Sequence, residues 1–207
     1  MPKNPTFFEE RALIARGISM IAGVDEAGCG CWAGPVYAAA VILPLNSRIG
    51  LVRDSKTLSH AQRVHVAARI REEAIAWALG TASAEEIDAL NIRRADALAM
   101  RRAVESLAVQ PGFVLVDAFT IPGLATPSKG IVRGDQKVKS IAAASILAKV
   151  ARDLYMEELD GQYPGYGFAA HKGYGTKKHQ EALARLGPCA AHRKSYAPIK
   201  ILLESGL

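Results

Sequence analysis

Residues 21–36, which read IAGVDEAGCGCWAGPV, constrain this chain more than any other stretch. An apolar run leads directly into two adjacent carboxylates, Asp25 and Glu26, and glycines follow at positions 28, 30 and 34. Adjacent carboxylates repel each other, and a buried carboxylate needs a cation or hydrogen-bond donors to stay ionised. A divalent metal ion meets that need, and glycines let backbone N–H groups approach a phosphate or a sugar. The plainer interpretation is a strand end with two solvated acids, which for an Asp-Glu pair alone is the commoner case.

Composition limits the class of protein. The 207 residues are 50% hydrophobic and 22% charged, which predicts one globular domain with a small C-terminal addition. The net charge of +6 favours a polyanionic partner, although ordinary solubility explains it equally well. Three cysteines without paired spacing predict neither a disulfide framework nor a closed zinc site, and they fit a cytoplasmic protein. The sequence shows no signal peptide and no apolar run long enough for a membrane span.

Three stretches have the pattern of strands. Residues 18–25 and 36–43 are predicted to form a hairpin joined by the glycine turn. The apolar run 113–116 predicts a strand buried on both faces that ends at Asp117. A buried helix is the rival for so short a run, but the preceding Pro-Gly favours a strand. Residues 118–138 are expected to form a loop or a weak strand.

Helix signals recur between and after these strands. Ser59 opens a capping box and predicts a helix to about Ala78. Its expected inward stripe consists of Val64, Ala68, Ile75 and Leu79. Further helices are predicted after the caps Ser83 and Asn91, over residues 139–159, and for about ten residues from Thr176. In the helix at 139–159 we expect Ile141, Ala144, Ala148, Ala151 and Leu154 to share one face.

Asp117 ends one buried strand as Asp25 ends another. In a sheet flanked by helices, strand ends converge on the crevice where ligands bind, so Asp25, Glu26 and Asp117 are expected to meet. Asp135 lies just ahead of the long helix and could supply a second metal ligand. Taken singly, an acid that interacts with the helix dipole is the preferred interpretation of Asp135.

Asp25 and Glu26 are adjacent at the end of a predicted strand, which limits whether both side chains can reach one site. Successive strand residues point to opposite faces, so both carboxylates face one site only if the strand distorts near the glycines. Alternatively, Glu26 contributes through its backbone carbonyl. Carboxylates without histidine or cysteine select Mg²⁺ or Mn²⁺. A pair of such ions can activate a water and stabilise the leaving oxygen in phosphodiester hydrolysis.

A second candidate stretch lies at residues 171–176, HKGYGT. It places Lys172, a tyrosine between two glycines and Thr176 at the start of a predicted helix. Helix N-termini bind phosphate, and such a tyrosine can stack on a base or sugar. We expect Tyr174 to contact substrate, whereas the aromatic residues at 163, 166 and 168 are expected to pack a C-terminal helix onto the sheet. The five histidines have no ligand spacing and are assigned surface or structural roles.

Taken together, these residues resemble ribonuclease HII, the type 2 ribonuclease H family. The similarity rests on VDEAG-x-G and AGPV within 24–36, DSK at 54–56, VDA at 116–118, the run 134–153, HKGYGT and a later HRKSY. It implies an α/β, ribonuclease H-like fold with a mixed central sheet flanked by helices. It further implies a catalytic domain at 1–160 and a helical substrate-holding region at 161–207, in one continuous globular unit.

The resemblance also implies an activity and a site. The expected enzyme is a monomeric, two-metal endonuclease that hydrolyses RNA in RNA–DNA hybrids and cuts 5′ to ribonucleotides embedded in duplex DNA, leaving 3′-hydroxyl and 5′-phosphate ends. Four acids match the metal site: Asp25, Glu26, Asp117 and Asp135. The residues expected to contact the substrate are Gly28, Cys29, Gly30, Lys56, Lys137, Lys172, Tyr174 and Thr176. Among them the glycine loop would sense the 2′-hydroxyl, and Tyr174 would stack at the junction.

The sequence departs from the family pattern at three places. Cys29 replaces the usual arginine between the two glycines, so one cationic contact is missing, and Cys31 replaces a proline. Asp117 is followed by Ala-Phe where many members have Gly-Asn. Two alternatives therefore stay open: a hybrid nuclease without junction preference, and a non-catalytic nucleic-acid-binding module. Retention of all four acids counts against the second.

Overall fold

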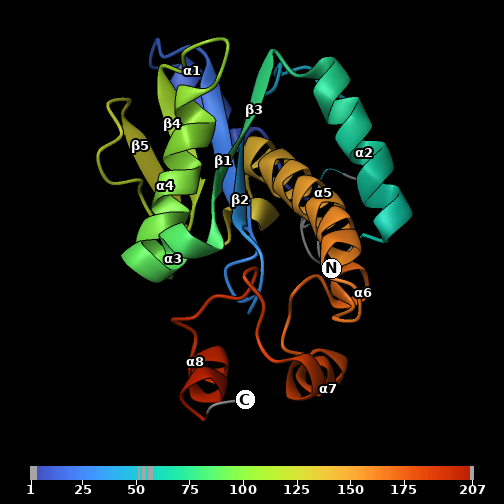
Figure 1. Cartoon of the computed structure of the whole chain (residues 1–207). Coiled ribbons are helices and arrows are strands. Elements are labelled where there is room, and N and C mark those ends of the chain that lie inside the picture. The colour runs from blue at the N-terminus through green and yellow to red at the C-terminus, as the bar shows by residue number, and fades with distance from the viewer. Residues whose placement is uncertain (1–3, 51, 53–54, 56–57, 206–207) are drawn as a thin grey trace.

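A computed structural model describes residues 4–50, 52, 55 and 58–205 of the chain. Its core is a five-stranded sheet with the order β3-β2-β1-β4-β5 (Figure 1). The strands are β1 (Ile21–Ala27), β2 (Val36–Ile42), β3 (Ala76–Ala82), β4 (Phe113–Asp117) and β5 (Ser128–Ile131). Strands β3, β2 and β1 pair antiparallel, whereas β1, β4 and β5 pair parallel. The expected mixed sheet and the expected hairpin are therefore confirmed.

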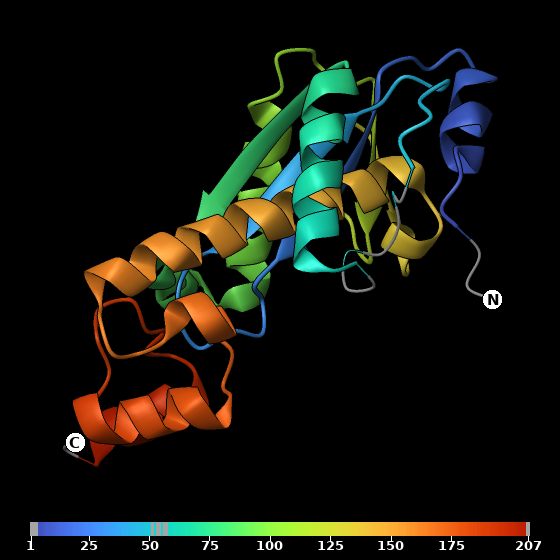
Figure 2. The same cartoon turned by 90° about the vertical axis from the view of Figure 1, so that its right-hand side faces the viewer.

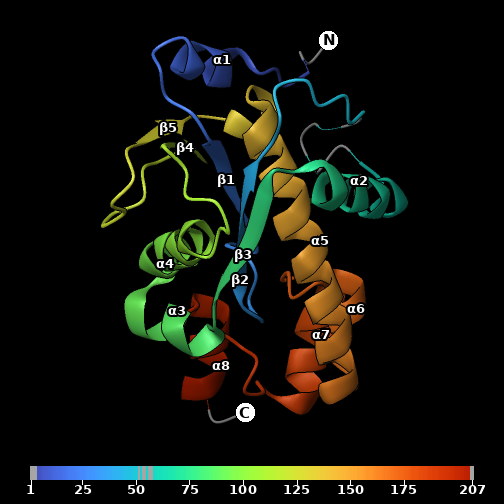
Figure 3. The same ribbon diagram turned by 90° about the horizontal axis from the view of Figure 1, so that it is seen from above.

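Helices cover both faces of the sheet (Figure 3). Helices α3 and α4 lie on one face, and α2 and α5 lie on the other. A further helix, α1, packs through Leu13 against Leu115 and Ile131. The helices of this part of the chain are α1 (Phe8–Ile14), α2 (His60–Glu73), α3 (Ala84–Leu90), α4 (Ile92–Glu105) and α5 (Lys139–Gln162).

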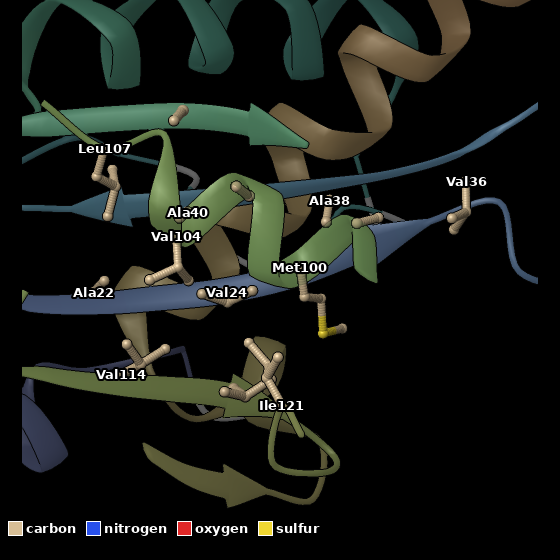
Figure 4. Close-up of a cluster of buried hydrophobic side chains, with 14 of the residues drawn as sticks. Ala22, Val24, Val36, Ala38, Ala40, Met100, Val104, Leu107, Val114 and Ile121 are labelled. Atoms are coloured by element: carbon tan, nitrogen blue, oxygen red, sulfur yellow. The ribbon is translucent and has the colours of Figure 1, made fainter. Parts of the chain in front are cut away.

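Two hydrophobic layers sandwich the sheet. Figure 4 shows the layer on the α4 face, where Val24 of β1 and Ala40 of β2 pack with Met100 and Val104 of α4. The opposite layer is formed by residues of β2, α2 and α5, among them Val41, Ile70 and Leu147. Strand β4 contributes to both sides, since Val114 and Val116 face the α4 layer while Leu115 packs near α1. The run 113–116 is thus the doubly buried strand that its unbroken apolar character predicts.

The helix starts follow the predicted caps. The side chains of Ser59 and Ser83 accept hydrogen bonds from the third backbone amide of α2 and α3, and both form complete capping boxes. Asn91 caps α4, and Thr176 caps a later helix in the same way. Local side-chain chemistry therefore fixes where these helices begin.

The predicted helix from Ser59 to about Ala78 begins correctly but extends too far. Helix α2 ends at Glu73, and Ala76–Ala82 form the edge strand β3. The predicted inward stripe is also wrong, because α2 buries Val66, Ala67 and Ile70 while Val64 is 41% exposed. Pairing of β3 with β2 overrides the helix propensity of the alanine-rich segment. In α5, similarly, Leu154 is exposed although its spacing predicts an inward position.

Two further parts of the chain, residues 118–138 and the region after α5, form short elements. The stretch 118–138 contains β5 and the short 3₁₀ turn η2 (Gly134–Gln136), as its mixed pattern suggests. Beyond α5 the chain forms α6 (Phe168–His171), α7 (Lys177–Leu186) and α8 (Ala197–Glu204), which extend past one end of the sheet (Figure 2). Their own core combines Met156 of α5 with Phe168, Leu183 and Ile199.

Aromatic and histidine rings fill this C-terminal core. Tyr166 and Phe168 are buried and stacked, which confirms their expected packing role. Three of the five histidines gather beside them, although their spacing in the sequence gives no sign of it. The His171 and His179 rings stack with centroids 4.3 Å apart, and the Nε2 atoms of His179 and His192 lie 3.0 Å apart. Their role is structural, as expected, but they form one cluster.

Candidate active site

Two of the predicted acids lie side by side at neighbouring strand ends. Val24 of β1 pairs in register with Val116 of β4, and Asp25 and Asp117 are the next residues along the two parallel strands. Asp25 is buried, and burial raises its pKa well above the ordinary value, with the charges of Glu26 and Asp117 as further causes. A hydrogen bond with Ser145 of α5 acts in the opposite direction. The sheet therefore places carboxylates together where negative charge is costly without a cation; Asp25, Asp117 and Asp135, with the backbone of Glu26, are called the acid pocket.

The segment that carries Asp135 is fastened to the same strand end. The backbone amide of Gly134 donates to Asp117 Oδ1 over 2.6 Å. Arg133, just before it, adopts the left-handed conformation with φ +56°, which turns the chain sharply into η2. Asp135 itself is 7% exposed. Three acids that are far apart in the sequence thus come from segments that meet at one edge of the sheet.

Glu26 does not follow Asp25 to the same face. Strand β1 stays regular through Ala27, so the distortion expected at the acid pair is not found. The Glu26 amide donates to Asp25 Oδ1 over 2.8 Å, while its carboxylate lies 3.8 Å from the Cys29 thiol. Asp96 of α4 completes this second group, whose ligand atoms lie within 4.8 Å of one another. The regular alternation of side chains along a strand accounts for the separation.

Two buried arginines determine the shape of the glycine turn after β1. Arg193 donates to the carbonyls of Gly28, Cys29 and Gly34, at 2.8, 3.0 and 2.9 Å. Arg152 of α5 donates to the carbonyls of Ala33 and Pro35. Both arginines are essentially inaccessible, at 0% and 1% exposure, so their charges are satisfied by backbone oxygens. Little in the sequence indicates these buried roles. Arg152 is a basic residue within an apolar helix, and Arg193 belongs to the HRKSY stretch.

The tyrosine loop lies against the glycine turn. The amide of Trp32 donates to the carbonyl of Gly173, and the Tyr174 carbonyl accepts from His179 Nδ1 at 3.0 Å. Burial raises the pKa of Tyr174, and the neighbouring Cys31 thiol adds to this rise. Even so, the Tyr174 residue stays 44% exposed. Figure 1 shows the turn extending below the sheet toward the C-terminal segments that carry these contacts.

The other predicted substrate contacts have varied surroundings. Lys172 Nζ pairs with Glu157 at 2.6 Å, and exposed Lys137 donates to the Val132 carbonyl. Thr176 caps α7. Lys56 lies outside the described residues, but its neighbour Ser55 is buried and its hydroxyl lies 3.0 Å from that of Ser145. Ser55 therefore contacts α5 at the residue that hydrogen-bonds Asp25.

Comparison with known proteins agrees with this geometry. Residues 22–199 match the family model of ribonuclease HII. A ribonuclease HII of Desulfitobacterium hafniense is 52% identical over 196 residues, which cover 95% of this chain and 75% of that protein. One from Moorella thermoacetica is 54% identical over 187 residues, covering 90% of this chain and 91% of that protein. The crystal structure of ribonuclease H2 from Pyrococcus horikoshii superposes with a TM-score of 0.76 at 26% identity, covering 89% of this chain and 97% of that chain.

The mixed sheet with its acids at adjacent strand ends, together with these comparisons, defines a nuclease of the ribonuclease H-like class. More narrowly, the chain belongs to the ribonuclease HII family and is an endonuclease that hydrolyses phosphodiester bonds. Within the described ranges, none of its helices combines the length and apolar character that a membrane-spanning segment requires.

Proposed function

We propose that this enzyme hydrolyses RNA in RNA–DNA hybrids and cuts duplex DNA 5′ to an embedded ribonucleotide, leaving 3′-hydroxyl and 5′-phosphate ends. One observation supports the proposal above all others. The strand end that carries Asp25 continues directly into a turn whose carbonyls are fixed by Arg193, and the loop of Tyr174 packs on that turn. A pocket of acids thus adjoins both elements proposed to read the ribose.

The residues of the acid pocket are suited to two hard divalent ions, Mg²⁺ or Mn²⁺. We propose that Asp25, Glu26, Asp117 and Asp135 hold them, with Glu26 acting chiefly through its backbone carbonyl because its side chain faces Cys29 and Asp96. The bound ions would supply an activated water and stabilisation of the leaving oxygen. The Asp117 carboxylate is held in place by the Gly134 amide, so its orientation is set before substrate binds.

The glycine turn and the tyrosine loop would contact different sides of the junction between ribonucleotide and deoxyribonucleotide. Backbone groups of Gly28, Cys29 and Gly30 would contact the ribose 2′-hydroxyl, which distinguishes RNA from DNA. The exposed ring of Tyr174 would stack on the neighbouring deoxyribonucleotide. Thr176, at the N-terminus of α7, would lie near a phosphate.

Basic groups extend the proposed substrate surface. A hollow of about 580 Å³ between α4 and the loop after β4 is lined by Arg93, Arg94 and Arg101 together with Phe119. Cationic side chains beside an aromatic ring suit a polyanion that carries bases. Lys56, Lys137 and Lys172 stay predicted phosphate contacts, although Lys172 would first have to leave Glu157. We further propose that residues 161–207 hold the duplex and that the enzyme acts as a monomer in the cytoplasm.

The second candidate is a hybrid nuclease without junction preference. Cys29 favours it, because this side chain turns toward Glu26 and offers no cation to the substrate. A duplex DNA with a single ribonucleotide separates the two. Cleavage 5′ to the ribose supports junction recognition, whereas cleavage confined to long hybrids supports the second candidate.

The acid pocket is tested by Asp25→Asn. We expect turnover on the single-ribonucleotide duplex to fall by about a hundredfold or more, since a metal ligand is lost. We also expect a higher Tm at neutral pH, because the buried, repelled charge is removed while an oxygen remains for the Glu26 amide. The matched control is Glu72→Gln on the exposed face of α2, which should leave the cleavage rate unchanged. Near-normal turnover of Asp25→Asn would contradict the site.

A further inference from the structure

A group of three ligand-type side chains lies on the α4 face of β1, across the strand from Asp25. It consists of Glu26 at the end of β1, Cys29 in the turn and Asp96 of α4. The Cys29 thiol lies 3.8 Å from Glu26 Oε1, and the three ligand atoms lie within 4.8 Å of one another. The donor set is one sulfur and two carboxylates, which differs from the all-oxygen acid pocket.

Asp96 is the side chain that most needs a partner. It is 4% exposed, and its Oδ1 atom has no hydrogen-bond partner among the described residues. A buried carboxylate oxygen without a partner is costly, and native structures rarely leave one without a reason. The Asp96 carboxylate contributes one oxygen to the group of Glu26 and Cys29, so a cation at the centre of the group would compensate its buried charge.

The buried Arg193 does not fill that role. The Arg193 guanidinium influences Cys29, but its donors are committed to the carbonyls of Gly28, Cys29 and Gly34 and to the Tyr196 hydroxyl. Burial and the carboxylate of Glu26 raise the pKa of Asp96 to about 8. A negative charge on Asp96 is therefore costly unless a cation binds beside it.

We propose that Glu26, Cys29 and Asp96 form a second metal site, separate from the acid pocket, that binds a thiophilic divalent ion, with Zn²⁺ as the best match. Zinc accepts thiolate and carboxylate ligands together, whereas Mg²⁺ takes oxygen ligands. Around a tetrahedral zinc, ligand atoms lie about 3.5 Å apart, so the three side chains need to close by about an ångström. Binding releases the protons of the Cys29 thiol and the Asp96 carboxyl to solvent, and it leaves a water in the fourth position.

Occupancy of this site would fix the end of β1. Glu26 adjoins Asp25 in the chain, and Cys29 lies between the two glycines of the turn. An ion that links both to α4 ties the turn to the helix layer. The binding itself does not depend on the proposed substrate, so its test and the cleavage test fail independently.

Cobalt provides the direct test, because Co²⁺ replaces zinc and a cobalt–thiolate bond gives a near-ultraviolet charge-transfer band. We expect the metal-free full-length protein to bind one equivalent of Co²⁺ with this band. Zn²⁺ should abolish the band and excess Mg²⁺ should not. Cys29→Ser should lose the band, and Asp96→Asn should weaken Co²⁺ binding by about tenfold or more.

Two further variants separate a metal site from a structural role. Cys189→Ser is the matched control, since Cys189 lies beside His192 in the C-terminal core and should not affect the band. Asp96→Asn should abolish the rise in Tm caused by zinc, whereas Cys189→Ser should keep it. A band that persists in Cys29→Ser, a band that depends on Cys189, or no binding of one equivalent would overturn the proposal.

Discussion

Two glycines of the turn after β1 look equivalent in the sequence but have opposite surroundings. Gly28 is buried with φ +102°, and a Cβ built there would lie 2.0 Å from Arg152 Nε. Gly30 is exposed, its φ is ordinary, and a Cβ there would meet nothing within 4 Å. Gly28 is therefore needed by the fold, whereas Gly30 leaves open space that the proposed substrate would occupy.

This contrast predicts different outcomes for two alanine variants. Gly28→Ala should lower the free energy of unfolding by about 2 kcal/mol or more, through backbone strain and displacement of Arg152. Gly30→Ala should unfold like the wild type in urea but cleave the single-ribonucleotide duplex more slowly, because the new methyl group meets the ribose. If Gly30→Ala cleaved that duplex at the wild-type rate, the turn would not approach the substrate at residue 30.

At the scale of elements, the close crossing of α5 over β1 positions the acid pocket. A Cβ at Gly23 would lie 2.2 Å from the Ser140 backbone, so the first turn of α5 rests directly on the strand. The same helix carries Ser145, which hydrogen-bonds Asp25, and Arg152, which fixes the turn. One helix thus sets the position of the acid and the shape of the loop that follows it.

The crossing predicts that Gly23→Ala destabilises the protein by about 3 kcal/mol, since backbone atoms rather than a flexible side chain must move. Gly161→Ala is the control, because Gly161 lies near the end of α5 with open space around it. Replacing this helical glycine should stabilise the protein by about 0.5–1 kcal/mol. Urea unfolding measures both. Equal effects of the two variants would argue against a tight contact between β1 and α5.

At the scale of the whole molecule, a chain of neutral histidines joins separate segments of the C-terminal region. His179 Nδ1 bonds the Tyr174 carbonyl, and its Nε2 contacts His192, whose Nδ1 accepts from the Cys189 amide. Burial lowers the pKa of both His179 and His192 to about 4, from an ordinary 6.5. Protonation would place two N–H groups against each other at the 3.0 Å contact.

The sign of the resulting pH effect follows from proton linkage. Between pH 6.5 and about 4 the unfolded chain binds more protons at these histidines, so their contribution to stability is complete above pH 6.5 and is lost as pH falls through this range. The loss reaches about 1.4 kcal/mol per pH unit for each histidine. Buried Asp25 and Asp96, whose pKa values are raised, act in the opposite sense.

The histidine contribution is therefore measured as a difference between variants. His192→Asn should flatten the decline of Tm between pH 6.5 and 4 relative to the wild type. His65→Asn, on the exposed surface of α2, should leave the decline unchanged. A wild-type slope in His192→Asn would show that this histidine is not neutral in the folded protein.

Local patterns in the sequence were sufficient for much of the fold and for the choice of acids. Capping side chains act within one turn of a helix, so Ser59, Ser83 and Asn91 marked true helix starts. Apolar runs that end in Asp25 and Asp117 marked two strands, and the structure shows that these are adjacent and parallel. The end of α2 could not be predicted from local patterns. The segment that follows becomes the edge strand β3 because it forms hydrogen bonds with β2.

By itself, the sequence determined the family, the mixed α/β sheet and the acids at its strand ends, because short-range chemistry and residue order encode them. Only the tertiary structure decided which neighbours each side chain meets. It turned Glu26 away from Asp25 toward Cys29 and Asp96, set two buried arginines on the glycine turn, and gathered three histidines into one core. Such contacts join residues that are distant in the chain, and their energies depend on burial that no local pattern contains.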